Sequence, residues 1–440
     1  MKREAYRSVD VKQVWVESLV TDKPGGVATV GLDVAKSEVM AVVRWSDGSF
    51  ERPWRAKNPE EIPEVIFRLQ QLAKGRSVTI AMEFTGTYGD ALRQALTDAK
   101  LNVHRVSGKA THDYAEIFDG VPSQHDGKDA AIVAELSALG KSSAWPYQPP
   151  AEADQEIAYW VERVDAQQRI EMLWLGPLEA WLARHWPEAT RHLQLNSATL
   201  LRVLAEYGGP AALAADPRAV QQLQRWGGRF LKREKIEWFV AAAATSVGVR
   251  QTAFDTRRVR ECAQAVLAAR EEVRQAEQEL EKLAQSHAVI RRQAAVVGSP
   301  TACVLWVYLG DPGDYHCAEA YRKAMGLNLK ERSSGRYQGQ LKITKRGPGA
   351  VRRWLYFAAM RLVQKSGVNA WYEAKKSRRD KGGKWALIAV MRKLAMGLYA
   401  VGVSDEPFDA GRLFAQEGGG SCCRRGVVRR RKKEEEKQHV

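Results

Sequence analysis

The chain has 440 residues, enough for two or three domains, and its hydrophobic content of 45% is sufficient for sizeable cores. Its net charge of +16 indicates a polyanionic partner, and no segment supports a membrane, since Val296–Gly310 is short and Ala386–Val403 contains Arg392 and Lys393. The five cysteines lack Cys-x-x-Cys spacing and the first 26 residues lack a signal-peptide core, which favours reduced cytoplasmic thiols over disulfides or a zinc site.

Residues 1–26 are expected to form a flexible extension that ends in the turn Lys23–Gly26. The region 27–149 then alternates between strand and helix patterns. Predicted strands are Val27–Asp33, Val39–Trp45, Ser49–Arg55, Val78–Glu83 and Leu101–Val106, and predicted helices are Asn58–Leu72, Asp90–Ala99 and Asp126–Gly140. Three antiparallel strands followed by alternating helix and strand are typical of the ribonuclease H-like (RuvC-like) α/β fold.

A helical pattern replaces the α/β pattern over residues 150–289, and part of it follows a heptad repeat. One seam of the repeat contains Val259, Val266, Val273 and Leu280, and the other contains Cys262, Ala269, Ala276 and Leu283. A helical hairpin within one chain and a coiled-coil contact between two chains explain this pattern equally well.

The last compact region is expected over residues 290–413, mainly helical with a glycine-rich loop. Residues 414–440 contain a Gly/Ser linker, a basic run and three glutamates, a composition that predicts a disordered tail. The predicted fold class is therefore an α/β domain, a helical coiled-coil middle and a mainly helical C-terminal domain.

Carboxylates occur at two predicted strand ends, Asp33 and Glu83, and at the start of a predicted helix, Asp126 and Asp129. A carboxylate at the end of an apolar strand needs a cation or hydrogen bonds, because burying an unpaired charge costs several kcal/mol. In a ribonuclease H-like sheet the first and fourth strands are neighbours, so all four groups could bind one or two Mg²⁺ ions for phosphoryl transfer. Taken singly, each pair more often caps a turn or a helix, but the complete set in this order is more specific.

Residues 322–365 contain twelve Lys or Arg and one acid, Glu331, a net charge of +11 that predicts a phosphate-binding surface. Within this stretch the loop Glu331–Arg336 places Ser333 and Ser334 between Arg332 and Arg336, and Lys345, Arg346, Arg352 and Arg353 follow. Such a serine is either a nucleophile toward a phosphodiester or a phosphate ligand, and the loop alone favours the ligand. Trp354, Tyr356 and Phe357 follow at a spacing more typical of a core than of a base-stacking surface.

Together these motifs resemble the bacterial insertion-sequence transposases that have an N-terminal RuvC-like DEDD domain and a C-terminal serine domain, regarded as bridge-RNA-guided recombinases. The resemblance covers roughly residues 27–413. Its motifs are Gly31-Leu32-Asp33-Val34-Ala35-Lys36, Glu83-Phe84-Thr85-Gly86-Thr87-Tyr88, Asp126-Gly127-Lys128-Asp129-Ala130, Ala324-Met325-Gly326-Leu327, Ser334-Gly335, Thr344-Lys345-Arg346-Gly347, Arg353-Trp354-Leu355-Tyr356 and Met391-Arg392-Lys393-Leu394-Ala395.

The resemblance implies a cytoplasmic, nucleoid-associated enzyme that excises and inserts DNA through a phosphoserine intermediate. It assigns Mg²⁺ to Asp33, Glu83, Asp126 and Asp129 and the nucleophile to Ser334 rather than Ser333. Implied partners are donor DNA, target DNA and a noncoding guide (bridge) RNA, and the implied assembly is a homo-oligomer, a dimer or a tetramer with active sites composed from two subunits.

Three features depart from the family pattern, one of which is that Ser333 and Ser334 are adjacent, so only the motif alignment selects Ser334. Gln124-His125 replaces the usual Lys-Thr before the third acid, and Val296-Val297-Gly298-Ser299 replaces a Pro-Gly-Ile-Gly hairpin that binds DNA. Two other functions also fit the residues. One is a metal-dependent junction-resolving nuclease that uses water, and the other is a nonenzymatic nucleic-acid-binding protein with structural acids.

Overall fold

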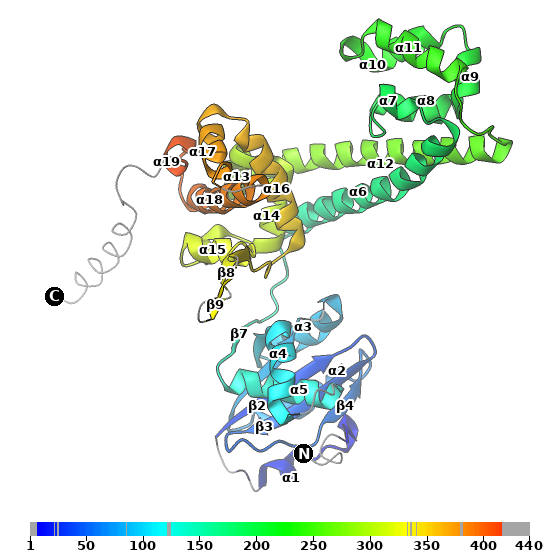
Figure 1. The fold of residues 1–440 in the computed structure, drawn as a ribbon. Coiled ribbons are helices and arrows are strands. Elements are labelled where there is room, and N and C mark those ends of the chain that lie inside the picture. Colours follow the sequence, from blue (N-terminus) through cyan, green and yellow to red (C-terminus); the bar gives the residue numbers. More distant parts are fainter. Residues whose placement is uncertain are drawn as a thin grey trace. The chain divides into compact units, whose positions relative to one another are not determined.

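The computed structural model describes residues 7–21, 23, 26–84, 86–120, 125–331, 333–334, 337–339, 341–378 and 382–415, with only the backbone at 333, 334, 337 and 338. The chain divides into two compact units, one from Met1 to Pro150 and one that begins at Ala151 (Figure 1).

The described residues of the first unit form a seven-stranded mixed sheet in the order β1-β4-β3-β2-β5-β6-β7. Strand β2 is antiparallel to β3 and parallel to β5, and β5 is parallel to β6. The first and fourth predicted strands are therefore neighbours, and the predicted ribonuclease H-like class is confirmed. The strands are β1 (Val9–Asp10), β2 (Val27–Val34), β3 (Glu38–Trp45), β4 (Trp54–Lys57), β5 (Ser77–Glu83), β6 (Asn102–Val106) and β7 (Ser142–Ala144).

Helices cover both faces of this sheet. Side chains alternate along a strand, so Ala28, Val30 and Leu32 of β2 share a core with α2 (Ile62–Leu72) and α3 (Asp90–Asp98). The opposite face packs against α4 (Gly108–Asp119) and α5 (Asp126–Ala138). Asp33 lies on this second face, because it alternates with Leu32. Helix α4 had no predicted counterpart, and it buries only the small side chains of Thr111 and Ala115.

Residues 9–21 differ from the expected flexible extension. They form β1, which pairs with β4, a short 3-10 turn (Val11–Gln13) and α1 (Val16–Thr21). Val11, Val14 and Val16 are buried in the core of the first unit. Three valines among charged neighbours are too few to give a recognisable strand or helix pattern in the sequence. They nevertheless anchor this segment along one edge of the sheet.

The second unit begins with a helical hairpin of α6 (Glu152–His185) and α12 (Ala253–Ser286), which pack against each other. Heptad residues of α12 are buried within this chain: Ala276 and Leu280 pack with Ile157 and Val161 of α6. The structure thus agrees with the intramolecular interpretation of the heptads. Charged residues in this seam would disrupt the hairpin itself.

A separate small domain of residues 186–252 is inserted between α6 and α12, and we call it the tip domain. Its core includes Leu178 and Leu182 near the end of α6 and Val259 and Val266 near the start of α12. The tip domain therefore lies at the opposite end of the hairpin from Ile157 and Leu280 (Figure 1). Its helices are α7 (Ala189–His192), α8 (Ala198–Tyr207), α9 (Pro210–Ala215), α10 (Ala219–Gly227) and α11 (Arg233–Ala244).

The C-terminal helices surround one apolar core that also receives the near ends of α6 and α12. Among the described residues, α18 is the one helix long and apolar enough to cross a membrane, yet its apolar residues are largely core, packed on α13, α15 and α16. Phe414 is also buried, against Trp371, so the packed chain extends into the predicted tail, whose residues 416–440 lie outside the described part. The helices are α13 (Ala288–Val297), α14 (Ser299–Leu309), α15 (Ala318–Ala324), α16 (Gly349–Val363), α17 (Ser366–Lys376), α18 (Gly383–Val403) and α19 (Ala410–Leu413).

Candidate nuclease site and serine hairpin

The first predicted motif positions a helix against a strand. Gly31 lies in β2, and a Cβ placed on it would be 2.0 Å from the carbonyl oxygen of Ala130 and 2.5 Å from the amide nitrogen of Ala134. Only glycine therefore allows α5 to pack so closely on β2. Asp33 is two residues beyond Gly31 on the same face of β2, and Asp126 is one helical turn before Ala130. The close packing thus brings the first turn of α5 to the end of β2.

The structure brings all four predicted carboxylates together. Burial, followed by the negative charges of Asp129, Asp126 and Glu83, raises the pKa of Asp33 to about 6. Burial also raises the pKa of Asp129, and Asp126 and Glu83 add to that increase, while His125 and Lys128 oppose it. The four acids therefore lie within electrostatic range of one another, and a cation near them would relieve this repulsion.

Glu83 is held at the end of β5 by α4. Its Oε2 accepts a hydrogen bond of 2.7 Å from the Thr111 hydroxyl. Its Oε1 lies so close to Gly108 that a Cβ there would be 2.0 Å away. Gly108 is the first residue of α4, so the carboxylate also lies near the positive end of the helix dipole. The helix that had no predicted counterpart therefore orients one of the predicted acids.

Two further side chains fix the start of α5. His125 is its N-cap, and Nδ1 accepts a hydrogen bond of 3.2 Å from the backbone N–H of Lys128. The fully buried Lys128 ammonium lies 2.7 Å from Asp119 Oδ1 and so links α5 to α4. His125 thus supplies the cap at the position where the sequence departs from the family pattern.

Divalent cations suit this cluster by chemistry. Carboxylate oxygens are the hard ligands that Mg²⁺ and similar ions prefer, and an excess of negative charge in a partly desolvated site is compensated by binding one. Within the described residues, no group of three or more His, Cys, Asp or Glu side chains is already close enough to hold a metal ion. The four acids are thus near enough to repel one another, but the structure does not by itself place them as a set of metal ligands.

The predicted serine loop is a β-hairpin. Its base pairs Leu329 and Lys330 of β8 with Ile343 and Lys342 of β11, and farther out β9 (Ser333–Ser334) pairs with β10 (Tyr337–Gln338). Tyr337 is opposite Ser334, which places Ser334 at the last paired position before the hairpin turn. The side chain of Ser334 and the residues Arg332 and Arg336 lie outside the described part of the structure.

The motifs Ala324–Leu327 and Thr344–Gly347, which are about twenty residues apart in the sequence, are in contact at the base of this hairpin. Gly347 packs so closely that a Cβ would lie 2.2 Å from the Ala324 carbonyl oxygen, and the Lys345 N–H donates to Gly326 O at 3.0 Å. Lys345 has a left-handed backbone, with φ of 57°. The side chains of Lys345 and Arg346 are exposed, so this loop presents both cations to solvent.

Arg352 and Arg353, predicted to contact phosphate, have partners within the chain. Arg352 Nη1 donates to Gly347 O at 2.7 Å and to Met325 O at 3.2 Å, which ties together the two motifs just described. Arg353 forms an ion pair with Asp165 of α6. Both arginines therefore contribute to the fold, a role that charge counting along the sequence did not reveal.

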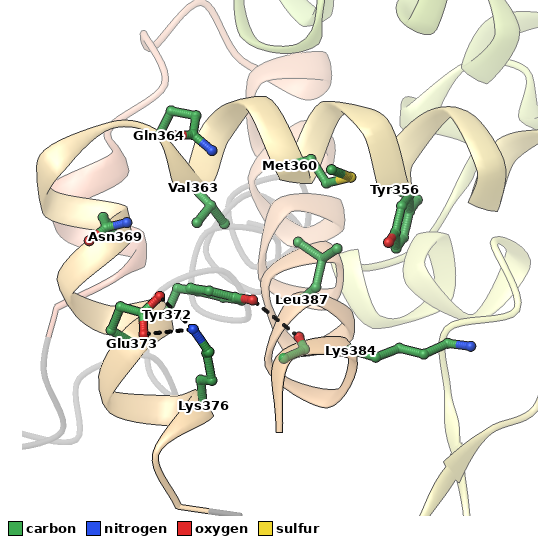
Figure 2. A pocket seen from close by; sticks show the side chains of 11 residues that line it. Tyr356, Met360, Val363, Gln364, Asn369, Tyr372, Glu373, Lys376, Lys384 and Leu387 are labelled. Carbon is green, nitrogen blue, oxygen red and sulfur yellow. Dashed lines mark hydrogen bonds and ion pairs between the residues drawn. The ribbon is translucent and has the colours of Figure 1, made fainter. Parts of the chain in front are cut away.

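The aromatic run on α16 is divided between core and surface. Trp354 packs against the core, as expected, whereas Tyr356 and Phe357 are 36% and 51% exposed. Tyr356 also lines a surface pocket of about 670 Å³, together with residues of α16, α17 and α18 that include Tyr372 and Lys384 (Figure 2). The expectation that all three aromatic residues are core is wrong for Tyr356 and Phe357, because α16 is covered on one side only.

Two regions of the chain match models of known protein families. Residues 30–168, which contain the carboxylate cluster, match the family model of IS110-type DEDD transposases, described as transposase. Residues 292–374, which contain the serine hairpin, match the family model described as transposase of the IS116/IS110/IS902 family. No curated protein matches the chain.

Proposed function

The chain belongs to the IS110 family of transposases, and from that premise we propose that it is an RNA-guided recombinase that moves its element through a covalent serine–DNA intermediate. Membership by itself makes the protein a DNA-cleaving and strand-transferring enzyme that acts with a divalent metal. The proposal adds Mg²⁺ as the metal, Ser334 as the nucleophile, a noncoding guide RNA and a homo-oligomeric assembly. The observation that carries it is the convergence of four carboxylates at the ends of β2 and β5 and the first turn of α5.

In the carboxylate cluster, Asp33, Glu83, Asp126 and Asp129 would hold the metal. A bound Mg²⁺ would supply Lewis-acid polarisation of the scissile phosphate. Thr111 and the start of α4 orient Glu83, and the His125 cap holds the helix turn that carries Asp126 and Asp129. The protein thus orients Glu83 and the helix turn that carries Asp126 and Asp129 without a bound ligand.

The serine step exchanges one phosphate ester for another. Ser334 Oγ loses its proton to a base and forms a bond to phosphorus, and the bond from phosphorus to a deoxyribose oxygen breaks. That oxygen leaves with a proton. Attack by a deoxyribose hydroxyl of another strand reverses the step and frees the serine, so no nucleotide hydrolysis is needed. Exposed cations next to the hairpin base, Lys345 and Arg346, would bind phosphate oxygens.

The RNA-guided part of the proposal is tested with the full chain expressed together with the noncoding DNA of its element. We expect one noncoding RNA to copurify, and recombination between donor and target DNA to require that RNA. Recombination that is equally efficient after ribonuclease treatment would refute RNA guidance. Light scattering of the active complex gives its mass, and an active monomer would refute the homo-oligomer.

Binding of nucleic acid is expected to depend steeply on salt through Lys345 and Arg346. The double variant Lys345→Ala, Arg346→Ala should reduce the slope of log affinity against log salt by roughly one to two, because each phosphate contact releases about one counterion. A fluorescence titration with DNA at several salt concentrations measures the slope. Arg352 and Arg353 are unsuitable for this test, since their loss would weaken the fold.

The matched control removes two other exposed cations, Arg274 and Lys282, which form ion pairs with acids of their own helix, α12. This control has the same loss of charge, so it separates local contacts from the effect of net charge. An equal change of slope in both variants would place Lys345 and Arg346 outside the interface.

A further inference from the structure

The tip domain presents an aromatic residue on a loop that is rigidly held. The loop joins α10 to α11, and Gln224 Nε2 donates to two of its carbonyl oxygens, Gly228 at 3.0 Å and Leu231 at 3.2 Å. Gly228 has a left-handed φ of 54°, and Gly227 contacts Leu231 so closely that a Cβ on it would lie 2.5 Å from the Leu231 Cβ. Because the loop is fixed in this way, Phe230 projects into solvent and is 86% exposed.

A second aromatic residue and several cations lie on the same segment. Trp238 of α11 is 67% exposed, whereas its helix neighbours Ile236 and Phe239 are buried in the core of the tip domain. The guanidinium of Arg229 lies over the Phe230 ring, 4.9 Å from its centroid. We define the tip surface as the exposed residues Arg225, Arg229, Phe230, Lys232, Lys235 and Trp238.

The net positive charge of this segment indicates a negatively charged partner. Residues 225–238 contain five Lys or Arg and two acids, a net charge of +3. One of the acids, Glu237, already forms an ion pair with Arg233. Exposed aromatic rings among unbalanced cations are the combination by which proteins bind single-stranded nucleic acid, since bases stack on the rings and phosphates contact the cations. In a duplex the bases are stacked on one another and do not reach such rings.

We propose that the tip surface is a second nucleic-acid-binding site, and that its ligand is a single strand of RNA or DNA. The tip domain lies outside residues 30–168 and 292–374, so the site is additional to the regions that identify the chain as a transposase. The proposal does not depend on Ser334 or on the carboxylate cluster. It adds an anchoring point for an unpaired strand at the end of the α6–α12 hairpin.

The test measures binding of the full chain to fluorescent single-stranded oligonucleotides of uridine and of thymidine and to a duplex of equal length. The double variant Phe230→Ala, Trp238→Ala should weaken binding of the single strands about tenfold or more, because stacking on each aromatic residue contributes that order of affinity. Duplex binding should change less than twofold. A larger loss for the uridine strand than for the thymidine strand would identify RNA as the ligand, and the reverse would identify DNA.

Two controls make the result specific. Val247→Ala removes another exposed apolar side chain of the tip domain, 83% exposed, and should leave binding unchanged. Crosslinking with a 4-thiouridine oligonucleotide should label peptides within residues 225–238. Unchanged single-strand affinity in the double variant, together with crosslinks confined to other regions, would overturn the proposal and leave the tip surface to a protein partner. Formation of the serine–DNA adduct in the double variant is recorded in parallel, so failure of this site is distinguishable from failure of the proposed function.

Discussion

Asp33→Asn is expected to abolish DNA cleavage and, at the same time, to stabilise the metal-free protein above pH 6. The rate of cleavage should fall more than a hundredfold, since changes in groups that only support a metal ligand already lower metal affinity or activity about ten- to a hundredfold. The gain in stability follows from the raised pKa of Asp33, about 6 against an ordinary value of 3.8. Between these values the folded protein binds more protons than the unfolded chain, so the stability of the metal-free protein falls as the pH rises from about 4 to 6.

Asparagine removes that penalty because it carries no charge. Above pH 6 the free energy of unfolding of the metal-free Asp33→Asn variant should therefore exceed that of the wild type by at most about 3 kcal/mol, and its melting temperature should be higher. Near pH 4 the two melting temperatures should match. Mg²⁺ should raise the melting temperature of the wild type above pH 6 but not that of the variant. Thermal denaturation with and without Mg²⁺ at several pH values, alongside a cleavage assay, measures both effects.

Asp113→Asn is the matched control for Asp33→Asn. Asp113 lies in the same domain, on α4, and forms an ion pair with Lys109 at the exposed surface. The identical chemical change there should leave cleavage and the response to Mg²⁺ intact. Normal cleavage by Asp33→Asn in Mg²⁺ would mean that the carboxylates have a structural role.

Ser334→Ala is expected to eliminate a covalent protein–DNA adduct that the wild type forms. A serine attack leaves DNA phosphate bound to the side chain, and this ester survives denaturation, whereas water-dependent hydrolysis leaves no such bond. Incubation with labelled DNA and Mg²⁺, followed by denaturing electrophoresis, detects the adduct. Recombination should fall below detection in the same variant, because no other step conserves the phosphate ester for rejoining.

Ser333→Ala is the control, since Ser333 and Ser334 are neighbours in β9 of the same hairpin. The adduct should persist in this variant. Loss of the adduct in Ser333→Ala alone would keep the mechanism and move the nucleophile by one residue. Continued cleavage by Ser334→Ala, with no adduct in any variant, would replace the recombinase mechanism with that of a metal-dependent nuclease.

The acidic residues illustrate how far one-dimensional patterns reach. Asp33 and Glu83 were recognisable as charges that end apolar strands, and Asp126 and Asp129 as acids in a first helical turn. What holds them together was less visible. Gly31 has a role only when α5 lies on top of it, and Gly108 and Thr111 belong to α4, a helix that the sequence analysis did not predict. A contact between two elements is not visible as a periodic pattern in the sequence of either element.

The basic stretch shows the complementary limit. The basic stretch contains the serine hairpin, but charge alone did not distinguish a cation on the surface from one that stabilises the fold. Arg352 binds main-chain carbonyls and Arg353 binds Asp165, which is 188 residues away in the sequence. Lys345 and Arg346 are exposed, while the Lys345 N–H donates to the Gly326 carbonyl oxygen and Lys345 has a left-handed backbone.

The sequence by itself determined the α/β class of the first unit and the helical nature of the rest, since the alternation of a strand and the periodicity of a helix can be read from neighbouring residues. Only the tertiary structure decided that the heptads of α12 pack on α6 of the same chain, that Val11 and Val16 belong to the first core, and that Phe230 lies outside the core of the tip domain. An apolar side chain gains about the same free energy by leaving water whichever surface covers it. The residue type therefore does not reveal which other residues it packs against. The partner is chosen by which surfaces the completed chain brings within contact.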